Sequence, residues 1–477
     1  MPNRTPVLVA AKAAPVAHEV VDGAIVARLN GSTGSVAGDI AGTFDVTVVA
    51  SAATEADVKM ARRHPDGLVV RSAGGRDIAL QLVEHAPQTL DPAHYGHVTE
   101  LLWHSMHGLW DGATEPTFGP ATEPAWAALH ALNDDIAGAL LRRCDRAGAA
   151  YLVQDYQLSL VPARLRAADP RARILYFHHI AWPGPDQLAM LPGHVVADLM
   201  AGVLAADVVA VFAERWRRRF LRCVEEFVPG AVVDHDTATV HHHGRTTRVA
   251  VEPLSYGADA VDALDRRWPA ELEAWVADGP LLVHAGRTDP IKNADRAVQA
   301  FEHAVTSPGG LDARLLVRLQ PHRLGIAANR DYRDRVAAAV ARANERIGAE
   351  RVRLLIDDDR RLTFGCLARA DVVLVNSVID GQNLTAFECS AVGRRNPVLV
   401  ITPTCGASEV LGDDALLVHP FDIVELAGAM RRAVAMPAAE RAARGERMRA
   451  AGDRVALPKW AARQLRLLDA PQDEAGE

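Results

Sequence analysis

Short apolar runs of strand length recur along this chain, and each is followed by a stretch with helical periodicity. A parallel strand buried on both faces is a continuous apolar run instead of an alternating one. Parallel strands also need long crossover connections, which are usually helices. The pattern therefore predicts an α/β protein built on parallel sheets that are covered on both faces. The runs are residues 6–11, 46–51, 150–154, 174–178, 208–212, 281–285, 315–319, 352–356, 372–375 and 398–401.

The chain has 477 residues, more than one hydrophobic core usually spans, so we expect two domains. Residues 232–251 lie between two series of strands and alternate like a hairpin. The segment that follows, 252–257, is the expected hinge. We predict a first domain at residues 1–252 and a second at 253–457. Residues 458–477 would form a C-terminal helix and tail, and packing back on the first domain is one arrangement open to them.

Composition limits the partners and the compartment. A net charge of −8 argues against a nucleic-acid partner. The five cysteines form no CxxC pair, which favours a reducing cytoplasm over a disulfide framework or a zinc site. Residues 1–21 are interrupted by Lys12, His18 and Glu19, so they indicate a first buried strand and not a signal peptide. No membrane segment is expected, because no apolar window is long enough.

Two segments of the second half carry the strongest functional signal, residues 286–292 and 380–388. Each follows an apolar run and leads into a helical pattern, which is the place where α/β sheets bind ligands. Arg287 and Lys292 would oppose the dipole at a helix start unless an anion binds there. The two segments therefore predict a nucleotide-diphosphate site, in which Glu388 accepts hydrogen bonds from a ribose. Asp380 and Asn383 could also be no more than helix caps.

The first half offers polar groups at two strand ends. Asp155 follows the run at 150–154, and His179 follows the run at 174–178, so both are candidates for a ligand site. The glycine-rich loop at 30–34 could bring the amides of Gly31 and Gly34 close to a phosphate. Three consecutive acids at 357–359 suggest magnesium as one alternative, but solvated acids are commoner at such a place. We expect no required metal.

These segments, with Asp155-Tyr156-Gln157-Leu158 and His179-Ile180-Ala181-Trp182-Pro183, resemble the trehalose-6-phosphate synthase family of retaining glycosyltransferases. The closer resemblance is to its pseudoglycosyltransferase branch, typified by validoxylamine A 7′-phosphate synthase. That resemblance implies a GT-B fold, in which two Rossmann-like domains have parallel sheets that face a central cleft. It also implies a first domain that binds the acceptor and a second that binds the nucleotide donor.

The resemblance further implies roles for individual residues. The expected catalytic residues are Arg287, Lys292, His179 and Asp380, of which the first two hold the donor diphosphate and the last two hold hydroxyls of the transferred ring. The expected donor-binding residues are Asn383, Leu384, Thr385, Glu388, Gly31 and Gly34. The expected acceptor-binding residues are Asp155, Tyr156, Gln157, Arg323 and Lys12.

Departures from the family pattern fall in the first half of the chain. Gln154 stands where the family has His, Ala181 where it has Pro, and Ala13 where it has the Arg that helps to bind the acceptor phosphate. Ser32 replaces one glycine of the first loop. The donor-side residues match, so we infer an altered acceptor.

The resemblance implies coupling of a nucleotide-activated C7-cyclitol, of the GDP-valienol type, to an amino-sugar or aminocyclitol through a C–N bond with retention. Such a reaction belongs to the biosynthesis of an aminocyclitol natural product of the validamycin or acarbose type. GDP is the expected nucleotide, as part of a substrate, and no cofactor is expected. The partners would be small molecules, and a homodimer is compatible with the sequence. The alternatives are a retaining glycosyltransferase that makes trehalose 6-phosphate or a related glucoside, and a non-catalytic nucleotide-binding subunit.

Overall fold

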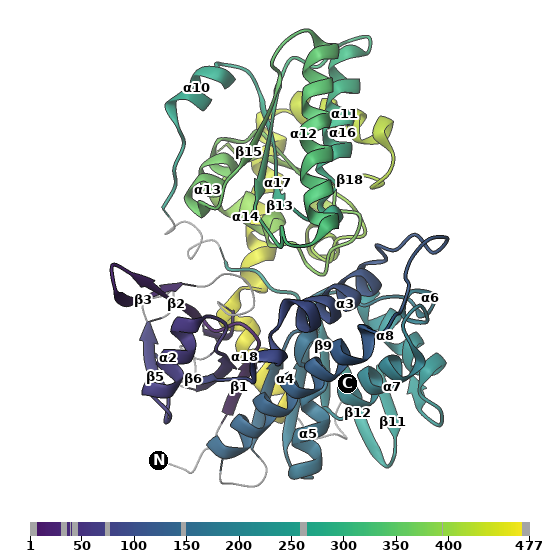
Figure 1. The fold of residues 1–477 in the computed structure, drawn as a ribbon. Helices are drawn as coiled ribbons and strands as arrows, with labels where there is room; N and C mark the ends of the chain where they lie inside the picture. Colours follow the sequence, from purple (N-terminus) through teal and green to yellow (C-terminus); the bar gives the residue numbers. More distant parts are fainter. Residues whose placement is uncertain are drawn as a thin grey trace. The chain divides into compact units, whose positions relative to one another are not determined.

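The computed structural model describes residues 7–29, 36–38, 40, 46–71, 77–144, 149–257, 265–393 and 395–469. The chain divides into two compact units (Figure 1). The first comprises Met1–Glu252 together with Leu457–Glu477, and the second comprises Pro253–Ala456.

The first unit contains a ten-stranded sheet in the order β10-β11-β12-β9-β8-β7-β1-β4-β6-β5. The central strands, from β12 to β6, are parallel, and antiparallel strands lie at both edges. The strands are β1 (Val7–Ala11), β4 (Thr47–Ser51), β5 (Leu68–Arg71), β6 (Asp77–Val83), β7 (Ala150–Gln154), β8 (Arg173–Phe177), β9 (Val208–Val211), β10 (Val232–Asp234), β11 (Thr239–His242) and β12 (Arg245–Val251). A separate hairpin pairs β2 (Val16–Val21) with β3 (Ala24–Leu29).

The helices of the first unit include a C-terminal one that returns to it. They are α2 (Glu55–Arg63), α3 (His97–His107), α4 (Thr122–Arg143), α5 (Val161–Ala168), α6 (Pro185–Leu188), α7 (Gly193–Leu204), α8 (Glu214–Phe227) and α18 (Leu457–Asp469). Trp460 anchors α18 by its fully buried indole, whose Nε1 donates to the carbonyl of Glu252 at 3.0 Å. Its ring also lies 5.0 Å from that of Phe177 at the end of β8.

The second unit contains a six-stranded parallel sheet in the order β15-β14-β13-β16-β17-β18. The strands are β13 (Leu281–Arg287), β14 (Arg314–Gln320), β15 (Val352–Ile356), β16 (Val372–Val375), β17 (Val398–Ile401) and β18 (Leu416–Leu417). The helices are α10 (Ala270–Val276), α11 (Ala294–Thr306), α12 (Ala327–Ile347), α13 (Arg360–Arg369), α14 (Leu384–Val392), α15 (Ser408–Leu411), α16 (Ile423–Ala435) and α17 (Ala438–Arg454). One hydrophobic cluster joins the sheet to α11, α12 and α16, and another joins it to α10, α13, α14 and α17, so both faces are covered (Figure 1).

Each expected apolar run forms a strand, which confirms the α/β class. Two expectations need correction. Residues 1–21 do not form one strand, because β1 ends at Ala11 and the chain turns into the separate hairpin. Residues 232–251 are not separate from the strand series, because β12 pairs in parallel with β9 and so adds β10 and β11 to the large sheet.

The direction of the crossovers reverses at one strand of each sheet. In the first unit β1 lies between β4 and β7, and in the second β13 lies between β14 and β16. Ligands of open α/β sheets bind beyond the carboxyl ends of the strands at such switch points. Ligand sites are therefore expected after β1 and β7 in one unit and after β13 and β16 in the other.

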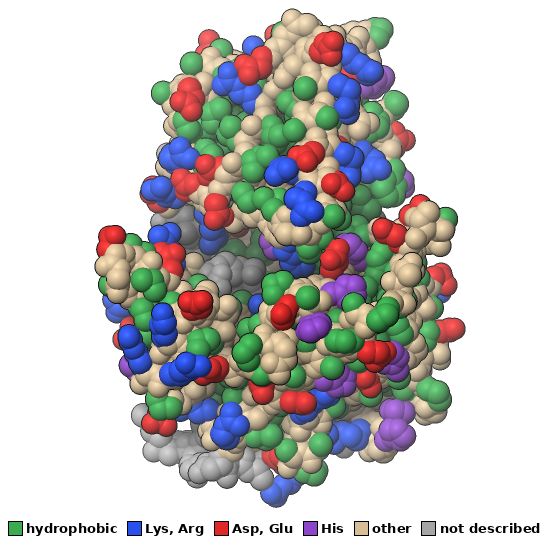
Figure 2. Space-filling view, in the orientation of Figure 1, with side chains coloured by type: hydrophobic (Ala, Val, Ile, Leu, Met, Phe, Trp, Pro, Cys, Tyr) green, Lys and Arg blue, Asp and Glu red, His purple; other side chains and the backbone are tan. Residues whose placement is uncertain are grey.

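Among the described residues, no helix combines the length and the apolarity that crossing a bilayer requires. Acidic and basic side chains are interspersed over the face drawn in Figure 2.

Candidate active site

A rigid turn follows β13 in the second unit. The hydroxyl of Thr288 donates to the carbonyl of His322 at 3.1 Å and accepts from the amide of the same residue at 2.7 Å. The carboxylate of Asp289 accepts from the amide of Ile291 at 3.3 Å. These bonds tie the turn to the segment after β14, so the side chains of Arg287 and Lys292 emerge from a fixed backbone.

Lys292 forms an ion pair with Asp380, which lies beyond the end of β16. Asn383 Nδ2 donates to the same carboxylate oxygen at 3.0 Å. Both partners of the ion pair are nearly buried, with side-chain exposures of 11% for Lys292 and 13% for Asp380. Burial opposes ionisation of Asp380, but the charges of Lys292 and Arg287 and the hydrogen bonds from Lys292 and Asn383 outweigh it, so its pKa is lowered. The two segments singled out in the sequence therefore meet in the fold.

Further positive charge gathers at the same edge of this sheet. Arg287 is one-third exposed, and its guanidinium lies 3.9 Å from the carboxylate of Asp289. Burial, together with the charges of Arg287, Arg323 and Lys292, lowers the pKa of His322 to about 2. His322 is therefore neutral, and three cations lie close enough to act on it. An arrangement of this kind favours an anionic ligand.

Helix α14 begins at this edge without a side-chain cap from any described residue. Asn383, at the N-cap position, has φ 71° and ψ 92°, and its amide group bonds Asp380 instead of the helix. The interpretation of Asp380 and Asn383 as simple helix caps is therefore wrong. The first amides of α14, those of Leu384 and Thr385, are the groups that a helix start offers to an anion.

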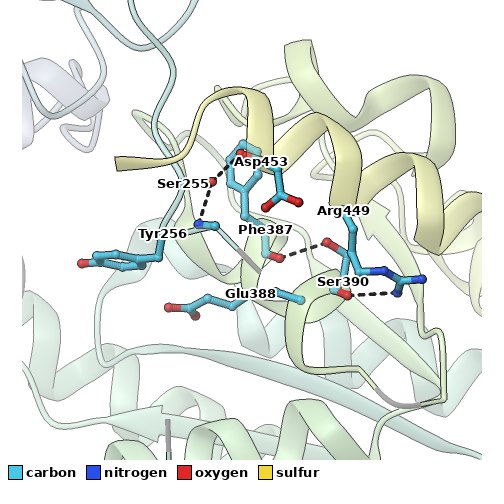
Figure 3. A pocket seen from close by; sticks show the side chains of 10 residues that line it. Ser255, Tyr256, Phe387, Glu388, Ser390, Arg449 and Asp453 are labelled. Atoms are coloured by element: carbon cyan, nitrogen blue, oxygen red, sulfur yellow. Dashed lines mark hydrogen bonds between the residues drawn. The ribbon is translucent and has the colours of Figure 1, made fainter. Parts of the chain in front are cut away.

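Glu388 lies one turn into α14 and is 9% exposed. Burial raises the pKa of its carboxyl group, and Arg360 acts weakly in the opposite direction. Within the described part of the chain its carboxylate has no hydrogen-bond partner. A pocket adjoins it, and in Figure 3 the carboxylate extends away from Arg449, on the side where Tyr256 lies. A buried acceptor of this kind suits a ligand that brings hydroxyl groups.

In the first unit, the chain after β7 has a strained backbone at the switch point. Asp155 has φ 81°, and it is held there by two bonds. Its carboxylate accepts from the amide of Tyr156 at 2.8 Å, and its own amide donates to the carbonyl of Phe177 at 2.8 Å. Such strain persists only where the surroundings enforce it, and it is concentrated at functional sites. Tyr156 and Gln157, in the turn that follows, are buried at 1% and 8% exposure.

His179 lies near this turn, just beyond the end of β8. Its Nε2 is 2.8 Å from Oε1 of Gln154, the last residue of β7. The rings of Phe177, Phe212 and Trp460 surround its imidazole at centroid distances of 4.6, 5.4 and 6.2 Å. Burial lowers its pKa to about 3, so the ring is neutral at physiological pH.

Lys12 follows β1, on the other side of the switch point. Its Nζ lies 5.1 Å from the centroid of the Tyr95 ring, in cation–π contact. Close by, His85 bonds Asp135 through Nδ1 at 2.8 Å and Ser51 through Nε2 at 2.9 Å. The charge of Lys12 contributes to the lowered pKa of His85, after the larger effect of burial.

The remaining candidates have different positions. Gly31 and Gly34 lie outside the described residues. Arg323 belongs to the second unit, beside His322. Asp359 caps α13 by accepting from the amide of Arg361 at 2.9 Å and also pairs with Arg267 at 2.9 Å.

Sequence reasoning missed the pairing of Gln154 with His179 and the neutral His322 among three cations. The polar residues at the ends of β7 and β14 were the available signal.

A model of the family named Glycosyltransferase family 20 matches residues 54–470. The chain therefore belongs to glycosyltransferase family 20, and it is a transferase.

Individual relatives are consistent with this class. The chain is 39% identical over 436 residues to validamine 7-phosphate valienyltransferase from Streptomyces hygroscopicus subsp. jinggangensis, covering 91% of this chain and 88% of that protein. Among solved structures, the N-terminal domain of trehalose-6-phosphate phosphatase from Candida albicans matches with a TM-score of 0.82 and 21% identity, over 98% of this chain and 97% of the other. A UDP-forming trehalose-phosphate synthase from Burkholderia xenovorans matches with a TM-score of 0.81 and 22% identity, over 98% and 99%. The fold is thus GT-B.

Proposed function

We propose that the protein is a pseudoglycosyltransferase, which couples a nucleotide-activated C7-cyclitol of the GDP-valienol type to an aminocyclitol or amino-sugar. The main support is the 39% identity to a relative whose name describes valienyl transfer to validamine 7-phosphate. By analogy the acceptor would carry a phosphate, and the product would serve the biosynthesis of an aminocyclitol natural product.

In this proposal the second unit binds the donor. Arg287 and Lys292 neutralise the diphosphate, the amides of Leu384 and Thr385 support it, and Glu388 accepts from the ribose. Asp380, already bonded by Lys292 and Asn383, would accept from a hydroxyl of the transferred ring. The observation that carries the assignment is this paired, nearly buried cluster beside an uncapped helix start.

The reaction breaks the bond between the cyclitol carbon and a diphosphate oxygen and forms a bond between that carbon and the acceptor nitrogen. The nitrogen supplies the electron pair, the diphosphate leaves with the pair of the broken bond, and one amine proton passes to a diphosphate oxygen. A valienyl ring lacks the ring oxygen of a sugar, so its allylic double bond would delocalise the developing positive charge. Preorganised donors aimed at the leaving group contribute about a hundredfold to a thousandfold each.

Attack on the face from which the diphosphate departs would retain configuration and requires no protein nucleophile. We further propose GDP as the leaving nucleotide, no resident metal, and a cytoplasmic setting. The five cysteines are free, and four of them are buried, in keeping with a reducing compartment.

The test is to incubate the protein with GDP-valienol and validamine 7-phosphate, with and without EDTA. We expect GDP and a C–N-linked product in equal amounts, by chromatography and mass spectrometry, and unchanged rates with the chelator. Turnover of UDP-glucose and glucose 6-phosphate without cyclitol coupling would instead identify a trehalose-phosphate synthase. Tight GDP binding with no turnover of either donor would identify a non-catalytic subunit.

A further inference from the structure

Gln154 is the last residue of β7, beside the switch point of the first sheet, and its side chain is fully buried. Its Oε1 lies 2.8 Å from Nε2 of His179. An amide oxygen can only accept, so Nε2 of His179 carries the hydrogen. A neutral imidazole carries a hydrogen on only one of its two nitrogens, so Nδ1 has a free lone pair and can accept a hydrogen bond. The contact with Gln154 therefore determines which tautomer His179 adopts.

The surroundings of His179 keep it neutral without the help of a neighbouring charge. Burial alone accounts for its low pKa. On the elements around it, His178 is adjacent in the chain, Asp155 follows β7, and Trp460 bonds Glu252, which pairs with Arg463 on α18. Phe212, just after β9, contributes an aromatic ring. His178 is itself bonded to Tyr176 at 3.0 Å and to the carbonyl of Ala181 at 3.3 Å, with its pKa lowered to about 3.

The amide nitrogen of Gln154 is buried and has no partner among the described residues. Nδ1 of His179 likewise forms no hydrogen bond within the described part of the chain. An unsatisfied buried donor destabilises the fold, so an oxygen atom from outside the protein is expected to accept from it. The pair thus offers two positions of fixed polarity, one that donates and one that accepts.

We propose that Gln154 determines specificity for the transferred ring. Its oxygen fixes His179 as the Nε2–H tautomer, so that Nδ1 accepts from one hydroxyl of the ring, and its nitrogen donates to a second ring oxygen. The ligand class is a polyhydroxylated carbocycle or sugar, and an analogue without these oxygens would leave both groups unsatisfied. This inference rests on the proposed function and on the contact of His179 with the transferred ring that the family resemblance implies.

The decisive variant is Gln154→Glu, which has the same size and keeps an acceptor for His179 but removes the donor and adds a charge. We expect kcat/KM for the donor to fall about 10- to 100-fold, the effect of one or two lost hydrogen bonds. The adjacent carboxylate would also favour the imidazolium form of His179. Activity should then fall with decreasing pH through an ionisation near or above about 6.5, the ordinary histidine value, that the wild-type profile lacks. Gln81→Glu, on β6 of the same unit, is the control and should leave both the rate and the profile unchanged.

A second measurement does not depend on whether Gln154→Glu folds. In wild-type protein labelled with ¹⁵N-histidine, with the signal assigned by His179→Asn, we expect a neutral Nε2–H tautomer down to pH 5. An Nδ1–H tautomer, or a Gln154→Glu variant with wild-type kcat/KM and pH profile, would overturn the inference. If the amide nitrogen of Gln154 bonds only a buried water, Gln154→Glu should change the thermal stability and leave KM for the donor unchanged. That result would also overturn the inference. If cyclitol coupling fails in the wild type, the proposed function and the assignment to a transferred ring fail with it. The tautomer measurement needs no substrate, so it still tests whether Gln154 fixes the tautomer of His179.

Discussion

The two candidate ligand sites lie at equivalent points of their sheets, yet they differ in the charge of their side chains. Beyond β13 and β16 the residues are charged, with Arg287 and the Lys292–Asp380 pair. At the ends of β7 and β8 the two paired groups are neutral, the amide of Gln154 and an uncharged His179, and the carboxylate of Asp155 is bonded to the amide of Tyr156. One edge suits the charge that accumulates on a departing diphosphate, and the other suits hydroxyl groups whose recognition depends on the direction of each hydrogen bond.

Both edges contain a non-glycine residue with a positive φ angle. Asp155 and Asn383 have φ values of 81° and 71°, and each stands between a strand at the switch point and the helical segment after it. A non-glycine residue in such a conformation costs of order 1–3 kcal/mol. In each case side-chain hydrogen bonds hold it, so the two halves of the chain use the same backbone solution to present different chemistry.

The largest effect is expected from Lys292→Met, which leaves Asp380 with Asn383 and Ser377 as its remaining close partners. Breaking a buried ion pair by removing one partner costs about 3–5 kcal/mol. The melting temperature of the nucleotide-free protein should fall, and Lys292→Met/Asp380→Asn should regain part of the loss in calorimetry. Equal losses in the single and double variants would show that the ion pair is not what holds this edge together.

The same pair gives a pH dependence. The pKa of Asp380 is lowered in the fold, so its stabilising effect exists above the ordinary carboxyl range and is lost as the pH falls through the folded value. Asp380→Asn should therefore reduce the acid sensitivity of the melting temperature.

Arg287→Ala should act mainly on the reaction. We expect a hundredfold to thousandfold loss of turnover, with weaker GDP binding, because a cation beside the leaving diphosphate is removed. Steady-state kinetics and calorimetric titration with GDP measure the two effects. The matched control is Arg346→Ala, an exposed arginine of α12 paired with Glu302, which should leave both unchanged. Wild-type turnover and GDP affinity in Arg287→Ala would exclude the proposed donor site.

Glu388→Gln should separate binding from stability. Burial raises the pKa of Glu388, so ionisation is a cost to the fold that is absent below the ordinary carboxyl range and grows as the pH rises to the folded value. The variant should therefore melt higher than the wild type at pH 7.5, with a smaller difference near pH 4. It should also bind GDP about 10- to 100-fold more weakly, since a hydrogen bond to a charged acceptor is lost. A variant that gains stability and keeps its GDP affinity would remove Glu388 from the donor site.

The sequence predicted most of the sheets for a physical reason. Buried parallel strands are continuous apolar runs, and β7, β15, β16 and β17 begin and end where those runs do. The sequence did not predict β6, in which buried and exposed residues alternate, or β18, which has two residues. β6 lies next to the edge strand β5, and β18 is itself at the edge of its sheet, so burial on two faces no longer dictates their composition.

The site was predictable to a similar extent. Lys292 and Asp380 are 88 residues apart, but parallel strands carry both to one edge of the sheet. Their direct pairing depends on side-chain rotamers, which residue spacing does not encode. The same is true of Asn383, whose side chain bonds Asp380 and does not cap α14. The partner of Gln154 was hidden for the same reason.

The smallest effect is expected from Lys12→Ala in the first unit. This variant tests whether a cation contributes to ligand binding near Gln154 and His179. Lys12 lies over Tyr95 after β1, so it can supply one cation to the acceptor phosphate that we propose. A single, partly exposed charge contributes about 1 kcal/mol, so acceptor KM should rise about fivefold at low salt and less at high salt. Lys59→Ala, an exposed lysine of α2, is the control. The difference in acceptor KM between Lys12→Ala and the wild type should vanish with a dephosphorylated acceptor. If the difference persists, Lys12 contacts the acceptor ring instead of its phosphate, and ring recognition in the first unit also depends on a charged side chain.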